Sequence, residues 1–295
     1  MNTPRRRRRR QSARHVIDLI GRVCVVTGAT RGLGLATSTA LAQMGARVVM
    51  LGRDRERGEE VAQRVRAAAA PGADASFVAM DLASIASVCA AAAEIAAEHR
   101  AIHVLVNNAG LHLRSRALST DGFEMTWAVN HLGPFLFTRQ LMSQLRAARM
   151  ARVVTVTSQF ARLGRVIPAT IGTERASSGL RAYCDTKLAN MLFTRELARR
   201  LEGSGVTANC VHPGLVATEL MRAWPTWLRH TWEWTLRTPQ NGARPIVRLA
   251  ALPGLAGVTG AYFVRDRRTK FPRRARSETL GAELWRETGR LVGLD

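Results

Sequence analysis

The apolar residues of this chain fall into short β-branched runs that alternate with longer stretches of helical period. The runs lie at 22–27, 46–51, 76–80, 102–106, 152–157, 206–211 and 260–264. Between them, apolar residues repeat every three or four positions over 35–44, 54–70, 84–99, 121–148, 183–201 and 239–251. Strands and helices that alternate in this way form parallel βαβ units. We therefore predict an α/β fold with one doubly wound, mostly parallel sheet and helices on both faces.

Two stretches depart from this regular pattern. Gly133-Pro134 interrupts the helix predicted over 121–148, and a kink there would free backbone carbonyls near Asn130. The asparagine would either hold a water or simply satisfy the kink. Residues 164–180 show no strong period, and we expect a mobile loop near the substrate.

A glycine-rich turn joins the first predicted strand to the first helix, with Gly28, Gly32 and Gly34 spaced as Gly-x-x-x-Gly-x-Gly. Glycines there let the backbone approach a pyrophosphate, and the helix N-terminus supplies N–H donors and a positive dipole end. The turn therefore predicts a nucleotide-binding site.

The residue after the second strand bears on which nucleotide binds. NAD-binding folds usually place an acidic residue there for the ribose 2′-hydroxyl, whereas this chain has Arg53. A guanidinium attracts a 2′-phosphate, and Arg31 in the glycine turn could reach the same group. This favours NADP over NAD. Two alternatives stay open: Arg53 is one surface arginine among many, or Asp54 turns in to bind the ribose.

Polar residues also stand where other predicted strands end. Asp81 follows the third strand, the Asn107–Gly110 turn follows the fourth and Ser158 follows the fifth. Ligands of open α/β sheets bind at the carboxyl ends of the strands, which argues for a role in the site. Ordinary turn chemistry is the alternative for the asparagine pair.

Tyr183 and Lys187 form the strongest candidate for chemistry. They are four residues apart on a predicted helix, so they share a face. A free phenol has a pKa of about 10. A nearby cation favours the phenolate and would bring that pKa toward working pH, where the tyrosine can exchange a proton with a substrate oxygen. Such pairs are common, and the alternative is a half-buried tyrosine beside a lysine that reaches to solvent.

Composition fits one large domain with a strong positive charge. The chain has 295 residues, 46% of them hydrophobic, and a formal net charge of +22. Arg5–Arg10 form an unbroken run, and a second basic cluster spans 265–276. We expect a disordered basic leader over 1–19 and a basic surface loop, with binding of nucleic acid or anionic lipid as the alternative. No aromatic residue interleaves with the first run, which disfavours nucleic acid.

The cysteines at 24, 89, 184 and 210 form no C-x-x-C pair, so we expect reduced thiols in a cytoplasmic protein and no metal site. No apolar run is long enough to span a bilayer. Residues 224–236 hold four tryptophans and are interpreted as a lid over an apolar substrate, an anchor at a membrane face or a core helix.

Together and in this order, the motifs resemble the short-chain dehydrogenase/reductase family over about residues 20–292. The matching elements are Thr27-Gly28-x-x-x-Gly32-x-Gly34, Asn107-Asn108-Ala109-Gly110, Asn130, Ser158, Tyr183-x-x-x-Lys187 and Pro213-Gly214. The retinol dehydrogenase branch is similar in narrower stretches, namely 130–136, 182–184, 187–190, 197–201 and 212–214. The resemblance implies a single Rossmann domain over 20–295, with a small substrate lid at about 215–237, after the sixth strand.

The resemblance also implies a role for each matching residue. Tyr183 would be the general acid/base, Lys187 would lower its pKa and hold the nicotinamide ribose, Ser158 would bind the substrate oxygen, and Asn130 would seat a water of the proton relay. The implied NADP(H) contacts are Gly28, Arg31, Gly32, Leu33 and Gly34 at the diphosphate; Arg53 at the 2′-phosphate; Asp81 and Leu82 at the adenine; Asn108, Ala109 and Gly110 at the ribose; and Pro213, Gly214 and Thr218 at the nicotinamide.

The implied function is an NADP(H)-dependent oxidoreductase that interconverts a carbonyl and an alcohol on a lipophilic small molecule. A sterol, polyketide or tetrapyrrole substrate is an alternative within the same chemistry. A non-catalytic NADP-binding regulator with a basic tail for nucleic acid or lipid is the alternative from another class. Many members of the retinol branch begin with an apolar membrane anchor, whereas this chain has an arginine leader, which argues against membrane residence. Peripheral membrane contact and a homo-oligomer stay open.

Overall fold

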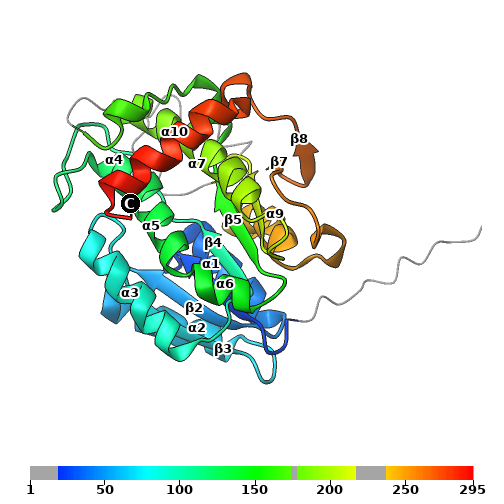
Figure 1. Ribbon diagram of the computed structural model, residues 1–295. Helices are drawn as coiled ribbons and strands as arrows, with labels where there is room; N and C mark the ends of the chain where they lie inside the picture. The colour runs from blue at the N-terminus through cyan, green and yellow to red at the C-terminus, as the bar shows by residue number, and fades with distance from the viewer. Residues whose placement is uncertain (1–18, 174–177, 217–236, 295) are drawn as a thin grey trace, which may run out of the picture.

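One sheet runs through the centre of the protein (Figure 1). A computed structural model describes residues 19–173, 178–216 and 237–294. The strands in these residues are β1 Val23–Thr27, β2 Arg47–Gly52, β3 Asp74–Ala79, β4 Val104–Asn107, β5 Arg152–Val156, β6 Thr207–His212, β7 Tyr262–Val264 and β8 Arg267–Thr269. Their order is β3-β2-β1-β4-β5-β6-β7-β8, and every pair is parallel except β7 with β8. The predicted doubly wound, mostly parallel α/β fold is confirmed.

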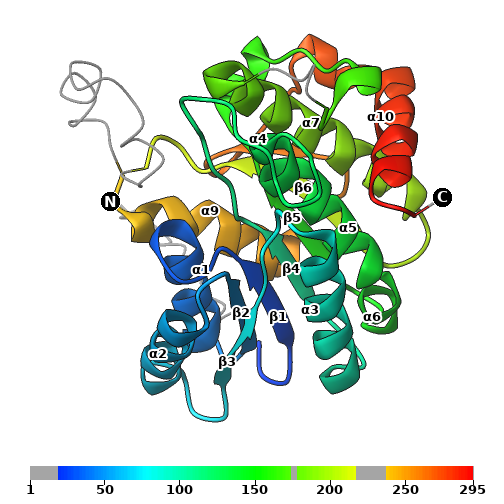
Figure 2. The ribbon, with the colours of Figure 1, turned by 90° about the vertical axis from the view of Figure 1, so that its left-hand side faces the viewer.

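Helices cover both faces of this sheet. They are α1 Gly32–Gln43, α2 Arg55–Ala67, α3 Ile85–Glu98, α4 Met125–Trp127, α5 Gly133–Gln140, α6 Met142–Ala147, α7 Gly179–Arg200, α9 Pro239–Ala251 and α10 Glu278–Leu291. Figure 2 shows α1, α2 and α9 on one side of the sheet and α3, α5 and α6 on the other. Several begin at side-chain caps that the sequence supplies, such as Asp54 before α2 and Ser84 before α3.

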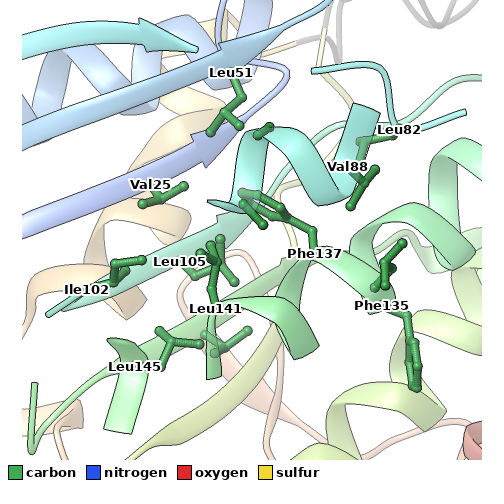
Figure 3. Packing of buried hydrophobic residues seen from close by; sticks show 14 of the residues in the cluster. Val25, Leu51, Leu82, Val88, Ile102, Leu105, Phe135, Phe137, Leu141 and Leu145 are labelled. Carbon is green, nitrogen blue, oxygen red and sulfur yellow. The ribbon is translucent and has the colours of Figure 1, made fainter. Parts of the chain in front are cut away.

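The two faces of the sheet build two apolar cores because successive strand residues point to opposite sides. In β1, Val23 and Val25 enter the core beneath α3 and α5, whereas Cys24 and Val26 enter the core beneath α1, α2 and α9. Figure 3 shows the first core, in which Leu105 and Phe137 are packed between the sheet and its covering helices. Both cores hold the strands rigidly, so the turns at their carboxyl ends have fixed positions.

Some elements differ from the sequence prediction. The eighth strand and the C-terminal helix α10 were not predicted. The single helix expected over 121–148 is divided into α4, a π-helical turn at Ala128–Leu132, α5 and α6. α5 continues directly from the π-helical turn, and Pro134 lacks the N–H that would otherwise bond to a carbonyl of that turn. The interruption therefore falls where Gly133-Pro134 predicted it, as a π-turn before the proline.

The helix α10 packs its apolar face over α7 and α5. The Trp285 indole stacks on Phe193, with ring centroids 5.9 Å apart, and meets the edge of Phe135 at 4.9 Å. The Arg200 guanidinium lies 4.6 Å from the centroid of the same indole. This cluster joins the C-terminal part of the chain to the helix that carries Tyr183.

Several predictions concern residues outside the described part. They are residues 1–18 of the basic leader expected over 1–19, and residues 217–236 of the lid expected at about 215–237, which include its tryptophans and Thr218. Leu19 does not belong to a disordered leader, because its side chain is buried in the core and its N–H donates to the Met44 carbonyl at 2.7 Å. Within the expected loop at 164–180, a short 3-10 turn forms at Pro168–Thr170. Among the described residues, no helix combines the length and the apolar character that crossing a bilayer would take.

Candidate active site

The glycine turn after β1 folds tightly against the turn after β4. Gly28 has a φ of +63° and Gly32 a φ of +54°, a region that glycine enters without steric cost. A Cβ built on Gly34 would lie 2.1 Å from the Gly28 carbonyl oxygen and 2.6 Å from the Asn108 Nδ2 atom. Only glycine fits at position 34. Because the turn has glycines at these positions, backbone atoms and not side chains are presented at the start of α1.

Asn108 holds this turn from the side. Its Nδ2 donates to the carbonyl oxygens of Thr27 at 2.8 Å and Gly28 at 3.2 Å. The Thr27 hydroxyl accepts from the main-chain N–H groups of Asn108 and Ala109, each at 3.0 Å. Asn107 is buried and donates to Thr138 at 2.9 Å. Both asparagine side chains thus brace neighbouring elements, and a contact of residues 108–110 with a ribose stays a prediction.

The arginines proposed for the 2′-phosphate lie at the same edge of the sheet. Arg31 is the residue before α1, Arg53 follows β2, and both are exposed. Asp54 accepts from the Arg57 N–H at 3.1 Å, so one of its oxygens caps α2. The first turn of α1 contains no acidic residue, which leaves its positive dipole end uncompensated.

Asp81 and Leu82 follow β3, on the same edge. One Asp81 carboxylate oxygen accepts from the Ala83 N–H at 3.0 Å, and the Asp81 N–H donates to Ser87 at 2.9 Å. Leu82 is buried in the core between the sheet, α3 and α5. Its side chain packs there, and the predicted adenine contact of the pair stays a prediction.

The structure brings Ser158, Tyr183 and Lys187 together at the ends of β5 and β4. Ser158 is buried directly after β5 and hydrogen-bonds the Tyr183 phenol. The Lys187 ammonium lies 5.6 Å from the centroid of the Tyr183 ring and donates to the Val156 carbonyl oxygen at 3.2 Å. Thr157 also donates to the Lys187 carbonyl at 2.8 Å, which fastens α7 to the end of β5.

The expected lowering of the Tyr183 pKa is not what the structure shows. Burial raises the pKa of this phenol to about 12, and the hydrogen bond from Ser158 opposes that rise only in part. Lys187 is itself buried, and burial lowers its pKa to about 8. The ammonium lies beside the Tyr183 ring and donates to the Val156 carbonyl oxygen. The helical spacing correctly predicted that Tyr183 and Lys187 share a face, but it could not predict how burial changes their pKa values.

Asn130 links these groups from the π-helical turn. It is fully buried, its Oδ1 accepts from the Leu111 N–H at 2.7 Å, and its Nδ2 donates to the Leu111 carbonyl at 2.9 Å and to Thr186 at 3.1 Å. A Cβ on Gly110 would lie 3.2 Å from the Lys187 Nζ and 3.3 Å from the Asn130 Oδ1, so the three residues are in close proximity. The side chain is committed to Leu111 and Thr186, and the predicted water stays a prediction.

Pro213 and Gly214 are buried at the end of β6. Gly214 has a φ of +95°, and a Cβ there would lie 3.3 Å from both the Arg237 and the Arg265 side chains. Burial lowers the pKa of His212 to about 4, with the charges of Arg265 and Arg162 acting in the same direction. The end of β6 is therefore a crowded, positively charged margin of the site.

Sequence reasoning missed two rings beside Tyr183. The His112 ring meets the Tyr183 ring edge-on at 5.8 Å between centroids, and the Phe160 ring lies at 6.5 Å. The signal for His112 was its place two residues beyond Gly110, at the carboxyl end of β4.

A dinucleotide fits the residues at this edge. The Gly28–Gly34 turn is a cradle that side chains would fill, the start of α1 offers N–H donors without a competing acid, and arginines stand on both sides. The residues predicted to hold the cofactor all lie at this one edge of the sheet, except Thr218, which is outside the described residues.

Comparisons with known proteins agree with this geometry. A family model described as short chain dehydrogenase matches residues 22–229. Retinol dehydrogenase 11 of Homo sapiens is 40% identical over 281 residues, which cover 94% of this chain and 88% of that protein. The crystal structure of an uncharacterised protein from Mycobacterium Paratuberculosis superposes with a TM-score of 0.76 and 31% identity, over 94% of this chain and 95% of that one. A protein from Beutenbergia cavernae, named as an NAD(P)-dependent gluconate 5-dehydrogenase and solved with NADP, has a TM-score of 0.70 and 29% identity, over 85% of this chain and 97% of that one.

Proposed function

Because the chain belongs to the short-chain dehydrogenase/reductase family and is an oxidoreductase of that family, we propose that it interconverts a carbonyl and an alcohol on a lipophilic substrate with NADP(H). The observation that carries the proposal is the cluster of the buried Ser158 and Lys187 with the half-buried Tyr183 beside the glycine turn. The resemblance to retinol dehydrogenases supports a lipophilic substrate.

Reduction is the direction that the protonation of Tyr183 favours. With a pKa of about 12, the phenol keeps its proton at neutral pH and can give it to the oxygen of a carbonyl. Bound NADPH would supply a hydride to the carbonyl carbon. Ser158 would orient the carbonyl oxygen, and the Lys187 charge nearby would favour the phenolate that remains after proton transfer. In alcohol oxidation the same phenolate would take the proton back.

The choice of NADP rests on charge at the end of β2. Arg53 stands where an acidic residue would accept from the 2′-hydroxyl of NAD, and Arg31 lies on the neighbouring turn. Asp54 is engaged as the cap of α2. The Beutenbergia cavernae structure, solved with NADP, is an example of a similar protein that accepts this cofactor.

The test is consumption of NADPH, followed by its absorbance, against a panel of lipophilic aldehydes and ketones that includes retinal, sterol ketones and aromatic ketones. We expect turnover with at least one of them and a clear preference for NADPH over NADH. A purified, folded protein that binds NADPH and consumes it with no carbonyl of the panel would contradict the proposal.

A further inference from the structure

The ring of His112 is held in a fixed position next to Tyr183. Both hydrogen-bonding groups of Leu111, the preceding residue, bind the buried Asn130 side chain, at 2.7 and 2.9 Å. The same side chain binds Thr186, on the turn of α7 between Tyr183 and Lys187. One buried amide therefore sets the position of the segment that carries His112 relative to the catalytic turn of α7.

The two nitrogens of this ring are polar atoms without a partner among the described residues. Both nitrogens of His112 are buried, and neither has a hydrogen-bond partner in the part of the chain that the structure describes. Burial, and then the charge of Arg114, lower its pKa, so at neutral pH the imidazole is uncharged. A neutral imidazole carries one N–H donor and one nitrogen acceptor. Leaving both buried without partners is costly, and such groups in a site usually mark where a ligand binds.

The neighbours of Tyr183 show that polarity at this position is not needed for packing. On another side of the phenol, the purely apolar Phe160 ring makes a similar edge contact, at 6.5 Å against 5.8 Å for His112. An apolar side chain at position 112 would fill the same space without an unpaired donor. The two imidazole nitrogens are therefore available to hydrogen-bond a ligand outside the described chain.

We propose that His112 is a specificity-determining residue, which hydrogen-bonds a second oxygen of the substrate close to the carbonyl or alcohol that reacts at Tyr183. The inference rests on the proposed oxidoreductase function and narrows its substrate class. The preferred substrate is a lipophilic molecule with two neighbouring oxygen functions, such as a vicinal diketone, an α-hydroxyketone or the matching diol. Ser158 and Tyr183 hold the reacting oxygen, and His112 holds the other.

The test compares two substrates that differ only in the second oxygen. The probes are an unbranched ten-carbon 2-ketone and the matching 2,3-diketone, each reduced with NADPH by the full-length protein. The preference is the ratio of the two kcat/KM values. The diketone is intrinsically more reactive, but that advantage is the same for every variant and cancels when the ratios are compared.

Three variants separate the outcomes. His112→Leu keeps the volume and removes both nitrogens, and we expect it to lower the preference for the diketone by ~10-fold or more, mainly through KM. His112→Asn keeps a donor and an acceptor, and should retain most of the preference. Phe160→Leu loosens the other ring contact of Tyr183 and should change both substrates alike. Because His112 makes no side-chain hydrogen bond to the residues at 19–173, 178–216 and 237–294, His112→Leu should unfold at the wild-type temperature or above it.

An unchanged preference in His112→Leu would overturn the inference, and so would an equal loss on both substrates, since that would place the ring on the reacting oxygen or on Tyr183. A lower unfolding temperature with an unchanged preference would assign the ring a structural role, against the inference. If none of the carbonyl compounds tested supports NADPH consumption by the wild-type protein, the proposed function fails as well. The two failures are therefore distinguishable.

Discussion

Replacing Gly34 with alanine tests how closely the turn that would hold the diphosphate is packed. The added Cβ would lie 2.1 Å from the Gly28 carbonyl oxygen and 2.6 Å from the Asn108 Nδ2, both closer than real Cβ contacts. The Gly28 carbonyl belongs to the backbone and is already held by Asn108 at 3.2 Å. Relief therefore requires that the turn or the start of α1 shifts and that this hydrogen bond weakens.

The magnitude follows from these two effects. Inserting a methyl group into a close-packed position costs about 1–3 kcal/mol. A weakened neutral hydrogen bond adds about 1 kcal/mol. The free energy of unfolding should thus fall by about 2–4 kcal/mol, which for a protein of this size lowers Tm by ~4–10 °C. Because the shifted backbone is the part that would contact the diphosphate, the Kd for NADP should rise by ~10-fold or more.

Thermal unfolding followed by circular dichroism gives Tm, and fluorescence titration gives the Kd for NADPH. Gly254→Ala is the matched control, because a Cβ there meets no atom within 4 Å and the glycine is not among those with a positive φ. The control should stay within ~0.5 kcal/mol of the wild type. If Gly34→Ala matches Gly254→Ala in both Tm and Kd, the reasoning about the turn is wrong.

Three further predictions concern charge. Arg53→Asp should move the ratio of kcat/KM for NADPH and NADH toward NADH by ~10-fold or more, since it replaces a partner of the 2′-phosphate with one of the 2′-hydroxyl; an unchanged ratio would remove Arg53 from this role. Burial lowers the pKa of Lys187 to about 8, so the reduction rate should fall as pH rises through about 8. Lys187→Met should lack this fall in rate and be slower by ~10²-fold at neutral pH, and a variant with the wild-type pH profile would contradict this. For Glu196, burial raises the pKa but its hydrogen bonds to Arg199 and Arg200 outweigh it and hold the pKa below its usual value, so the contribution to stability is present above the unfolded pKa of about 4.3 and is lost as pH falls below it. Glu196→Gln should therefore lower the denaturation midpoint at about pH 7, and its difference from the wild type should shrink as pH falls below about 4.3; a difference of the same size in acid would refute the linkage.

The sequence predicted the features that depend on local pattern. The β-branched runs located seven of the strands, because buried parallel strands need continuous apolar stretches. The spacing of Tyr183 and Lys187 predicted a shared helix face, and the turn residues predicted the carboxyl edge on which the site lies. These inferences need only the helical and strand periods and the rules of parallel sheets.

Features that depend on tertiary contacts were not readable in this way. Strand β8 consists of Arg267–Thr269 and is exposed, so its pairing with β7 and not its composition defines it. The sequence did carry a signal for α10, in the Ser277 cap and the apolar positions 280, 284 and 291. Burial at Tyr183 and Lys187 moves both pKa values against the simple rule for a neighbouring pair. The partners of Asn108 and Asn130 lie far away along the chain, as do those of most buried amides.

The turnover of Tyr183→Phe tests the central claim most directly. The substitution removes only the hydroxyl that Ser158 contacts and leaves the ring beside His112 and Phe160. We predict that consumption of NADPH with a substrate found for the wild type falls by ~10²–10⁴-fold, while the Kd for NADPH changes little. Wild-type turnover in this variant would show that another group supplies the proton, and the chemistry assigned to this helix would be wrong.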